Sequence, residues 1–152
     1  FFFEVRNFHY SLKKQLVSDI KFYALDTGFV NSVAFSFSEN IGRLYENVVC
    51  NALIRKGRQI FFFRDATHEC DFIVKEGNKI TKAVQVCYHL TEQNLKREIG
   101  GLVSACKAFD LNTGYIITEQ ADRIMEEDGV EIRIVPIVEY LLGLSHTSIQ
   151  FS

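Results

Sequence analysis

The chain has 152 residues, of which 47% are hydrophobic and 24% charged, and its formal net charge at pH 7 is −2. This length suits one domain with its own hydrophobic core. The small negative charge excludes a surface that is basic throughout, as tight non-specific nucleic-acid binding requires, but it is compatible with a local basic groove. The longest apolar run is far too short to cross a bilayer, so we expect no membrane partner.

The cysteines are spread along the chain and do not form close pairs; they are Cys50, Cys70, Cys87 and Cys106. A structural zinc site usually needs CxxC or CxxH pairs. The spacing therefore favours free thiols in a reducing compartment, and we expect the protein to be cytoplasmic.

The first 20 residues begin with Phe1-Phe2-Phe3-Glu4 and contain no basic segment ahead of these apolar residues. This pattern differs from a secretory signal peptide. We expect a strand or connector over 1–9, and Ser11 as the cap of a short turn that leads into 12–20. We interpret 1–20 as a connector or a remnant of an upstream region.

The segment after residue 20 predicts an α/β domain over 21–143, followed by a tail over 144–152. A strand at 21–25 stops at Asp26-Thr27-Gly28. A helix over 41–56 follows from the apolar spacing of Ile41, Leu44, Tyr45, Val48, Val49, Ala52 and Leu53. Ser38 or Asn40 is its expected N-cap, and Gly57 its C-terminal glycine.

The second half of the chain alternates strands and helices. We predict strands at 59–64, 69–74, 80–88, 114–118 and 130–135, a helix at 92–109 capped by Thr91, a short helix at 119–128 and a last helix at 137–142. A hairpin turn at 75–79 joins the second and third strands. This order predicts a mixed central sheet with helices on both faces.

Four side chains form the candidate site. Asp71 lies in one strand of the predicted hairpin, and Gln85 and Cys87 lie two residues apart in the other, so they share a face of the sheet. Glu46 lies on the flank of the first long helix. Oxygen ligands of this kind can hold Mg²⁺ or Mn²⁺ for phosphodiester cleavage, which also benefits from a nearby cation.

Asp71, the hairpin and Gln85-Val86-Cys87 resemble the PD-(D/E)xK, restriction-endonuclease-like nuclease core. More broadly, the chain resembles the C-terminal domain of unknown function that follows an AAA-type ATPase module in a large prokaryotic family. The matching stretches are Lys21-Phe22-Tyr23-Ala24-Leu25-Asp26-Thr27-Gly28, Gly42-Arg43-Leu44-Tyr45-Glu46-Asn47, Glu69-Cys70-Asp71-Phe72 and Gln85-Val86-Cys87. The resemblance implies a restriction-endonuclease-like fold, and ATP binding in an upstream module.

The chain departs from the nuclease pattern at its third element, which is Glu-x-Lys in that family. Gln85 is neutral and Cys87 supplies no cation, so Asp71, Gln85 and Glu46 are expected to be vestigial catalytic groups and weak metal ligands. Lys96 or Arg97 is an alternative source of the cation. Each residue also has a purely structural interpretation: Glu46 as a partner of Arg43, Gln85 as a buried amide that satisfies its neighbours, and Cys87 as core.

Three functions follow from this pattern. The first is a non-catalytic binding or assembly module attached to an AAA-type ATPase, with the ATPase module and a nucleic acid or protein as partners. The second is a weak metal-dependent nuclease acting on DNA or RNA. The third is a structural dimerisation domain. The chain itself contains no GxxxxGK[ST] motif, so ATP is expected only in the upstream module.

Overall fold

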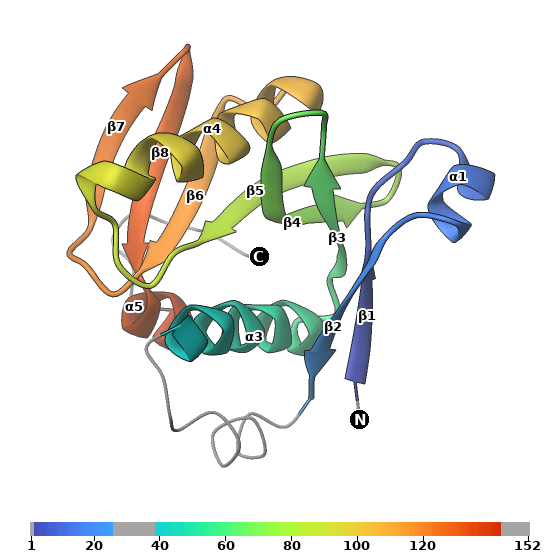
Figure 1. Cartoon of the computed structure of the whole chain (residues 1–152), viewed down its shortest axis with the longest axis horizontal. Helices are drawn as coiled ribbons and strands as arrows, with labels where there is room; N and C mark the ends of the chain where they lie inside the picture. The colour runs from blue at the N-terminus through green and yellow to red at the C-terminus, as the bar shows by residue number, and fades with distance from the viewer. Residues whose placement is uncertain (1, 26–38, 144–152) are drawn as a thin grey trace.

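The computed structural model of the chain describes residues 2–25 and 39–143 (Figure 1). The elements in chain order are β1 (Phe2–Arg6), α1 (Leu12–Leu16), β2 (Ile20–Ala24), α3 (Glu39–Arg55), β3 (Gln59–Arg64), β4 (Glu69–Glu76), β5 (Lys79–Val86), α4 (Glu92–Ala108), β6 (Thr113–Thr118), β7 (Arg123–Glu127), β8 (Val130–Pro136) and α5 (Ile137–Leu142). None of the helices in these ranges is long and apolar enough to cross a membrane.

Six strands form one mixed sheet in the order β3-β4-β5-β6-β8-β7. Its centre is parallel, because β6 lies parallel to both β5 and β8. The strands at its two sides are joined by antiparallel hairpins, β3-β4-β5 on one side and β8-β7 on the other. The expected mixed α/β class is therefore confirmed.

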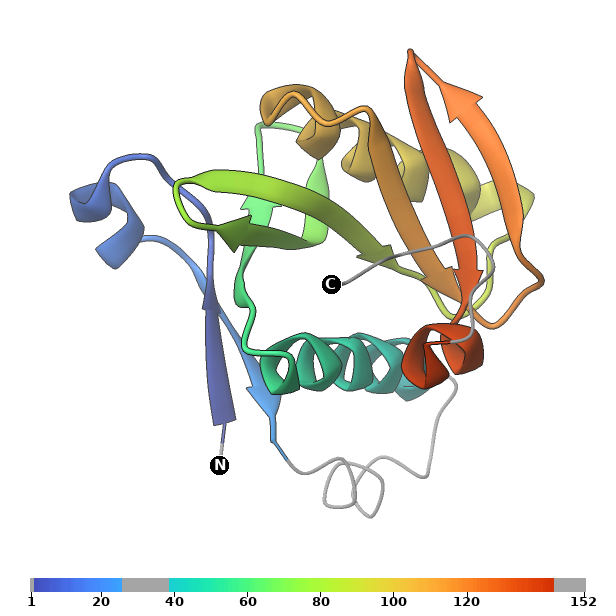
Figure 2. The ribbon, with the colours of Figure 1, turned by 180° about the vertical axis from the view of Figure 1, so that it is seen from behind.

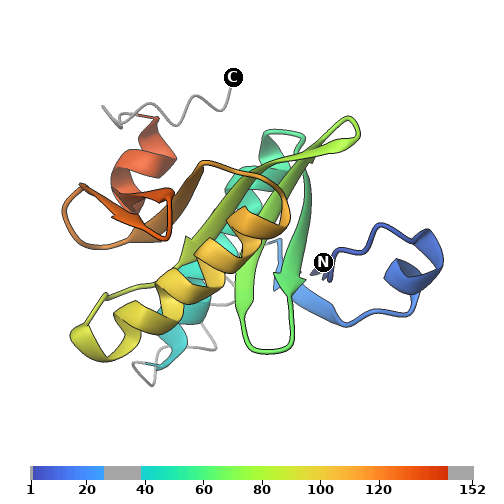
Figure 3. The same cartoon turned by 90° about the horizontal axis from the view of Figure 1, so that it is seen from above.

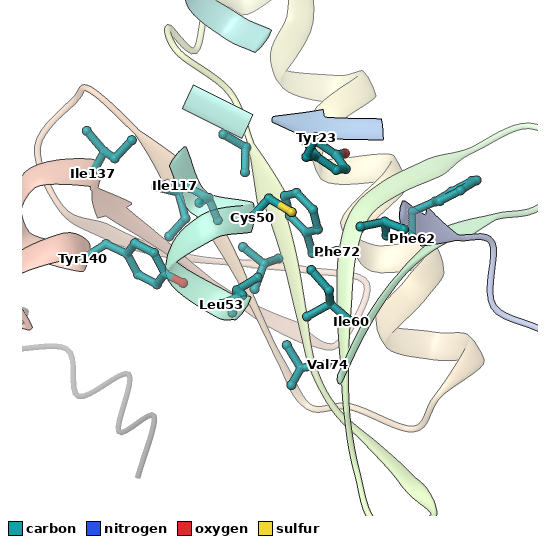
Figure 4. Packing of buried hydrophobic residues seen from close by; sticks show 14 of the residues in the cluster. Tyr23, Cys50, Leu53, Ile60, Phe62, Phe72, Val74, Ile117, Ile137 and Tyr140 are labelled. Carbon is teal, nitrogen blue, oxygen red and sulfur yellow. The ribbon is translucent and has the colours of Figure 1, made fainter. Parts of the chain in front are cut away.

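Helices cover both faces of the sheet. Helix α3 packs Val49, Cys50 and Leu53 on one face, as Figure 4 shows for Cys50 and Leu53 beside Phe72. Helix α4 packs Leu102 and other side chains on the opposite face, and Figure 3 shows it lying along the strands. Burying each of these large side chains stabilises the fold by about 1.5–3 kcal/mol, so the two helices fix the positions of the groups that they carry.

Strands β1 and β2 form an antiparallel hairpin beside the main sheet. Val5 is fully buried in the core under α3, and the N–H of Phe8 donates to the Phe62 carbonyl at 2.9 Å. Helix α1 ends at Leu16 and β2 begins at Ile20, one residue before the predicted start of the strand at 21–25. The proposed division at residue 20 stays a prediction; both of its sides lie in this one hairpin.

The helix predicted over 119–128 is wrong, because residues 123–127 form strand β7. Asp128 and Gly129 both have positive φ angles, 52° and 79°. Two such residues form the tight turn that joins antiparallel strands, and an Asp-Gly pair is a common sequence for it. Pairing with β8 therefore overrides the local polar character of this segment.

The predicted helix ends are confirmed in part. Thr91 caps α4, with its side chain accepting from the Asn94 N–H, and Gly57 follows α3 with a φ of 68°. Ser11 makes no side-chain cap hydrogen bond. Asn40 lies inside α3, and Ser38 lies outside the described residues, as do the predicted stop at 26–28 and the tail at 144–152.

Candidate functional site

The candidate site lies where β4 begins and β5 ends. The antiparallel register pairs Phe72 with Val84, which places Asp71 beside the end of β5. Helix α3 and the neighbouring hairpin approach this point from one side, and α4 approaches from the other. A cavity of about 660 Å³ opens there, and its acidic and amide lining consists of Glu46, Asp65, Glu69, Asp71, Gln85 and Glu98.

A single ammonium group holds three of these carboxylates together. Lys21 Nζ lies 2.6 Å from Glu69 Oε1 and 3.5 Å from both Glu46 Oε1 and Asp71 Oδ1. Burial on its own would lower the pKa of Lys21, but the three carboxylates outweigh it, so the pKa is raised above its ordinary value. Lys21 is therefore a permanent cation at the centre of the site.

Glu46 points toward this cluster from α3. Its carboxylate accepts a hydrogen bond from the Tyr23 hydroxyl as well as contacting Lys21. The alternative that Glu46 pairs with Arg43 is wrong, because no ion pair joins the two. The Tyr23 hydroxyl is kept protonated, since burial and the nearby Glu46 charge both raise its pKa.

Two buried asparagines of α3 attach β2 to the helix. Asn47 accepts from the Ala24 N–H at 2.8 Å and donates to the Ala24 carbonyl at 2.7 Å. Asn51 donates to the same carbonyl at 2.9 Å. Because these bonds satisfy the backbone at the end of β2, they hold Lys21 and Tyr23 in position against Glu46.

Asp71 is almost fully enclosed, with 8% of its surface exposed. Its Oδ2 accepts from the Val86 N–H at 3.0 Å. Burial and the Glu46 charge raise the pKa of Asp71 to about 7, against the lowering effect of Lys21. The carboxyl therefore changes its charge state close to neutral pH.

Gln85 forms the second half of the network. Its Oε1 accepts from the Asp71 N–H at 3.2 Å, and its Nε2 donates to Glu98 Oε2 at 2.7 Å. The other oxygen of Glu98 accepts from Arg97 Nε at 3.1 Å and Nη2 at 2.7 Å. Both ends of the Gln85 amide are thus engaged, which agrees with its interpretation as a buried amide that satisfies its neighbours.

Cys87 lines the same cavity, but its thiol is neutral and hydrogen-bonded. Its thiol donates to the His89 carbonyl at 3.4 Å and lies 3.7 Å from Asn94 Nδ2. Burial, together with the charge of Glu98, raises the pKa of Cys87 to about 11. The thiol is therefore neutral at physiological pH and is a poor nucleophile.

A divalent metal at this site would have to displace partners that the side chains already have. Glu46, Glu69 and Asp71 already face one ammonium group, and both groups of the Gln85 amide are hydrogen-bonded. In residues 2–25 and 39–143, no group of three His, Cys, Asp or Glu side chains is arranged to hold a metal ion. Glu46, Asp71 and Gln85 do come together, but their roles as ligands or catalytic groups stay predictions.

Lys21 and Glu98 were not predicted as site residues from the sequence. Lys21 is charged in an otherwise apolar strand, and Glu98 lies three residues after Leu95 and four before Leu102, on the inward stripe of α4. A charged residue within an apolar strand, or on the inward face of a helix, was the signal that could have identified both residues. Of the two cations that were considered, Arg97 lines the cavity and binds Glu98, whereas Lys96 is absent from the lining.

Comparison with known proteins places the chain among domains of unknown function. Residues 41–140 match a family model described as "Domain of unknown function (DUF4143)". The chain is also 35% identical over 150 residues to the uncharacterized protein MJ1544 of Methanocaldococcus jannaschii, an alignment that covers 92% of this chain and 33% of that protein. The chain thus spans about a third of the length of this relative.

Proposed function

This chain belongs to the DUF4143 family, and we propose that it is a non-catalytic binding or assembly module with a degenerate restriction-endonuclease-like fold. The observation that supports this proposal best is the position of Lys21, whose ammonium lies among Glu46, Glu69 and Asp71. These carboxylates already form ion pairs with a cation of the protein itself. A divalent ion would have to displace a half-buried, paired ammonium before it could bind them.

Gln85 and Cys87 support the same proposal. In the nuclease pattern a metal activates the water that cleaves the phosphodiester, and Mg²⁺ gives up its hydration shell reluctantly. Gln85 contributes no charge and already donates to Glu98. Cys87 stays neutral, so it cannot stabilise charge that develops on a phosphate.

We further propose that the module works in a longer protein beside an AAA-type ATPase module that binds ATP. The supporting facts are the resemblance described above and the length of the Methanocaldococcus jannaschii relative, of which the chain covers 33%. The test is the sequence of the whole protein. A GxxxxGK[ST] motif outside these 152 residues supports the ATPase context, and its absence from the full-length protein removes that part of the proposal.

One observation favours the nuclease alternative. Five carboxylates line one cavity, and Lys21 supplies a cation beside three of them; the five belong to Glu46, Asp65, Glu69, Asp71 and Glu98. If a metal displaced this ammonium, the same groups would contain acids and a cation of the kind that nucleases use. This is the second candidate, and the cleavage assay separates it from the first.

The assay incubates the purified chain with plasmid DNA, single-stranded DNA and RNA in Mn²⁺, in Mg²⁺ and in EDTA. We expect no cleavage above that of an Asp71→Ala preparation made in the same way. Metal-dependent cleavage that disappears in Asp71→Ala would establish the nuclease instead. A Gln85→Glu, Cys87→Lys double variant is the converse check, since we expect it to bind Mn²⁺ more tightly than the parent chain.

A further inference from the structure

Strand β7 is the open edge of the main sheet, at the end opposite to β3. Figures 1 and 2 show it as the outermost strand from both sides. No strand within residues 2–25 and 39–143 pairs with its outer side. Four of its five residues are exposed, including Ile124, which has 53% of its surface accessible. An exposed edge of this kind presents backbone groups that another strand can bind.

The turn fixes which backbone groups of β7 face outward. Glu127 and Val130 flank the two-residue turn, so they are the hydrogen-bonded pair that closes it. Bonded and non-bonded pairs alternate along antiparallel strands. The next pair, Glu126 with Glu131, is therefore non-bonded. In agreement, the Glu131 N–H donates at 2.9 Å to the Asn112 carbonyl, on the far side of β8 from β7.

The same alternation makes Ile124 equivalent to Glu126. Ile124 is paired with Arg133, two positions farther from the turn, and this pair is also non-bonded. The N–H and C=O groups of Ile124 and Glu126 consequently point away from β8, toward the open edge. An added antiparallel strand requires outward-facing N–H and C=O groups on alternate residues, and Ile124 and Glu126 provide them.

The sequence of β7 is complementary to itself across a two-fold axis. Arg-Ile-Met-Glu-Glu begins with a cation and ends with an anion. When two copies are placed antiparallel with Met125 opposite Met125, Ile124 faces Glu126 and Arg123 faces Glu127, each twice. The outward groups of Ile124 and Glu126 then bond to each other, and opposite charges meet at both ends.

Neighbouring registers are less favourable. A shift by one residue brings an outward-facing residue opposite an inward-facing one, which breaks the hydrogen-bond pattern. A shift by two residues toward the turn places Glu126 directly opposite Glu126, and a shift by two residues away from the turn places Asp122 opposite Glu126. Both arrangements bring like charges together and are repulsive. In the favoured register, Asp122 comes toward Asp128, but Asp128 belongs to the turn and is neutralised by Lys107 Nζ at 2.9 Å.

We propose that β7 pairs with β7 of a second copy of this chain in that register, so that the two six-stranded sheets become one continuous sheet across a two-fold axis. Arg123 and Glu127 have no ion-pair partner among the described residues, so both are available to the second copy. A two-fold contact uses the same surface on both subunits and closes the assembly at two copies. The open edge is thereby protected.

The test is sedimentation equilibrium of the 152-residue chain and of two charge-reversal variants, over protein concentrations from about 1 μM to about 1 mM. The parent chain should show a reversible monomer–dimer equilibrium. Arg123→Glu places Glu opposite Glu127 at both ends, and Glu127→Arg places Arg opposite Arg123. Each variant alone should dimerise about tenfold more weakly or worse.

Mixing the two variants provides the decisive measurement. A chain with Glu at 123 and 127 complements one with Arg at both positions, so the mixture should form a heterodimer at least as well as the parent chain dimerises. Circular dichroism controls for folding of each variant. A parent chain that is monomeric at all concentrations, or a mixture that dimerises no better than its components, would overturn the proposal.

Discussion

Gly101 of α4 lies directly against the backbone carbonyl of Glu69 in β4: a Cβ atom on Gly101 would be only 2.1 Å from that oxygen. No side chain fits at this distance, so the helix can approach the strand only with glycine here. The approach brings Glu98, one turn earlier in α4, within hydrogen-bond distance of Gln85. The contact therefore positions one half of the candidate site.

The first prediction is that Gly101→Ala destabilises the fold by about 1–3 kcal/mol or more, because the backbone of β4 or the helix must move to relieve the overlap. Gly42→Ala is the matched control. Gly42 is also inside a helix, but a Cβ there meets nothing within 4 Å, so Ala should stabilise by about 0.5–1 kcal/mol. Urea denaturation measures both, and equal effects would contradict the packing argument.

The second prediction concerns the ammonium in the site. Lys21→Met leaves Glu46 and Asp71 facing each other without a cation, whereas Glu69 keeps its ion pair with Arg64. The free energy of unfolding at pH 8 should fall by about 1–3 kcal/mol, a value below that for a fully buried pair because Lys21 is partly solvated. At pH 5 the loss should shrink, because Asp71 becomes protonated and the repulsion decreases.

Lys21→Arg is the control for this experiment, since it keeps the charge and should retain most of the stability. Urea denaturation at the two pH values is the measurement. An equal loss at pH 5 and pH 8 in Lys21→Met would mean that the lysine acts through the packing of its aliphatic stem and that its charge contributes nothing measurable.

The third prediction is a pH dependence that Asp71 causes. Its pKa is raised to about 7 in the folded protein, against about 3.9 in an unfolded chain. Between these values the folded state binds more protons than the unfolded state, so the contribution of Asp71 to stability is lost as pH rises from about 4 to about 7. Above pH 7 the contribution stays constant.

Asp71→Asn tests this dependence, because an amide oxygen can still accept from the Val86 N–H but does not ionise. The unfolding free energy of Asp71→Asn, relative to that of the parent chain, should increase as pH rises from 4 to 7 and then level off. A direct NMR titration of the Asp71 carboxyl provides the folded-state pKa. A difference that does not change with pH would refute the assignment.

The long helices and the hairpin β4-β5 could be predicted from the sequence because their apolar periodicity is local. The strand at 123–127 could not, because its stabilisation comes from pairing with β8 and its residues are mostly polar and exposed. The meeting of Glu46, Asp71 and Gln85 could be predicted from the alternation of side chains along the two strands and from the side of the helix on which Glu46 lies. Lys21 was missed because it reaches the site from a hairpin that lies outside the main sheet.

The last prediction concerns Gln85, which separates Asp71 from Glu98. Gln85→Glu replaces the amide N–H₂ that donates to Glu98 at 2.7 Å with a second carboxylate oxygen. Two buried carboxylates would then face each other next to Asp71, so the unfolding free energy at pH 8 in EDTA should fall by about 2–4 kcal/mol. The new cluster of acids should favour a divalent cation, so added Mn²⁺ should raise the Tm of Gln85→Glu more than that of the parent chain.

The double variant Gln85→Glu, Glu98→Gln reverses the direction of the hydrogen bond and restores the original charge. It should therefore recover most of the stability and lose the extra response to Mn²⁺. Thermal unfolding of the three proteins with and without Mn²⁺ makes the comparison, and an equal response to Mn²⁺ in all of them would show that the neutral amide is not what keeps this site from binding a metal.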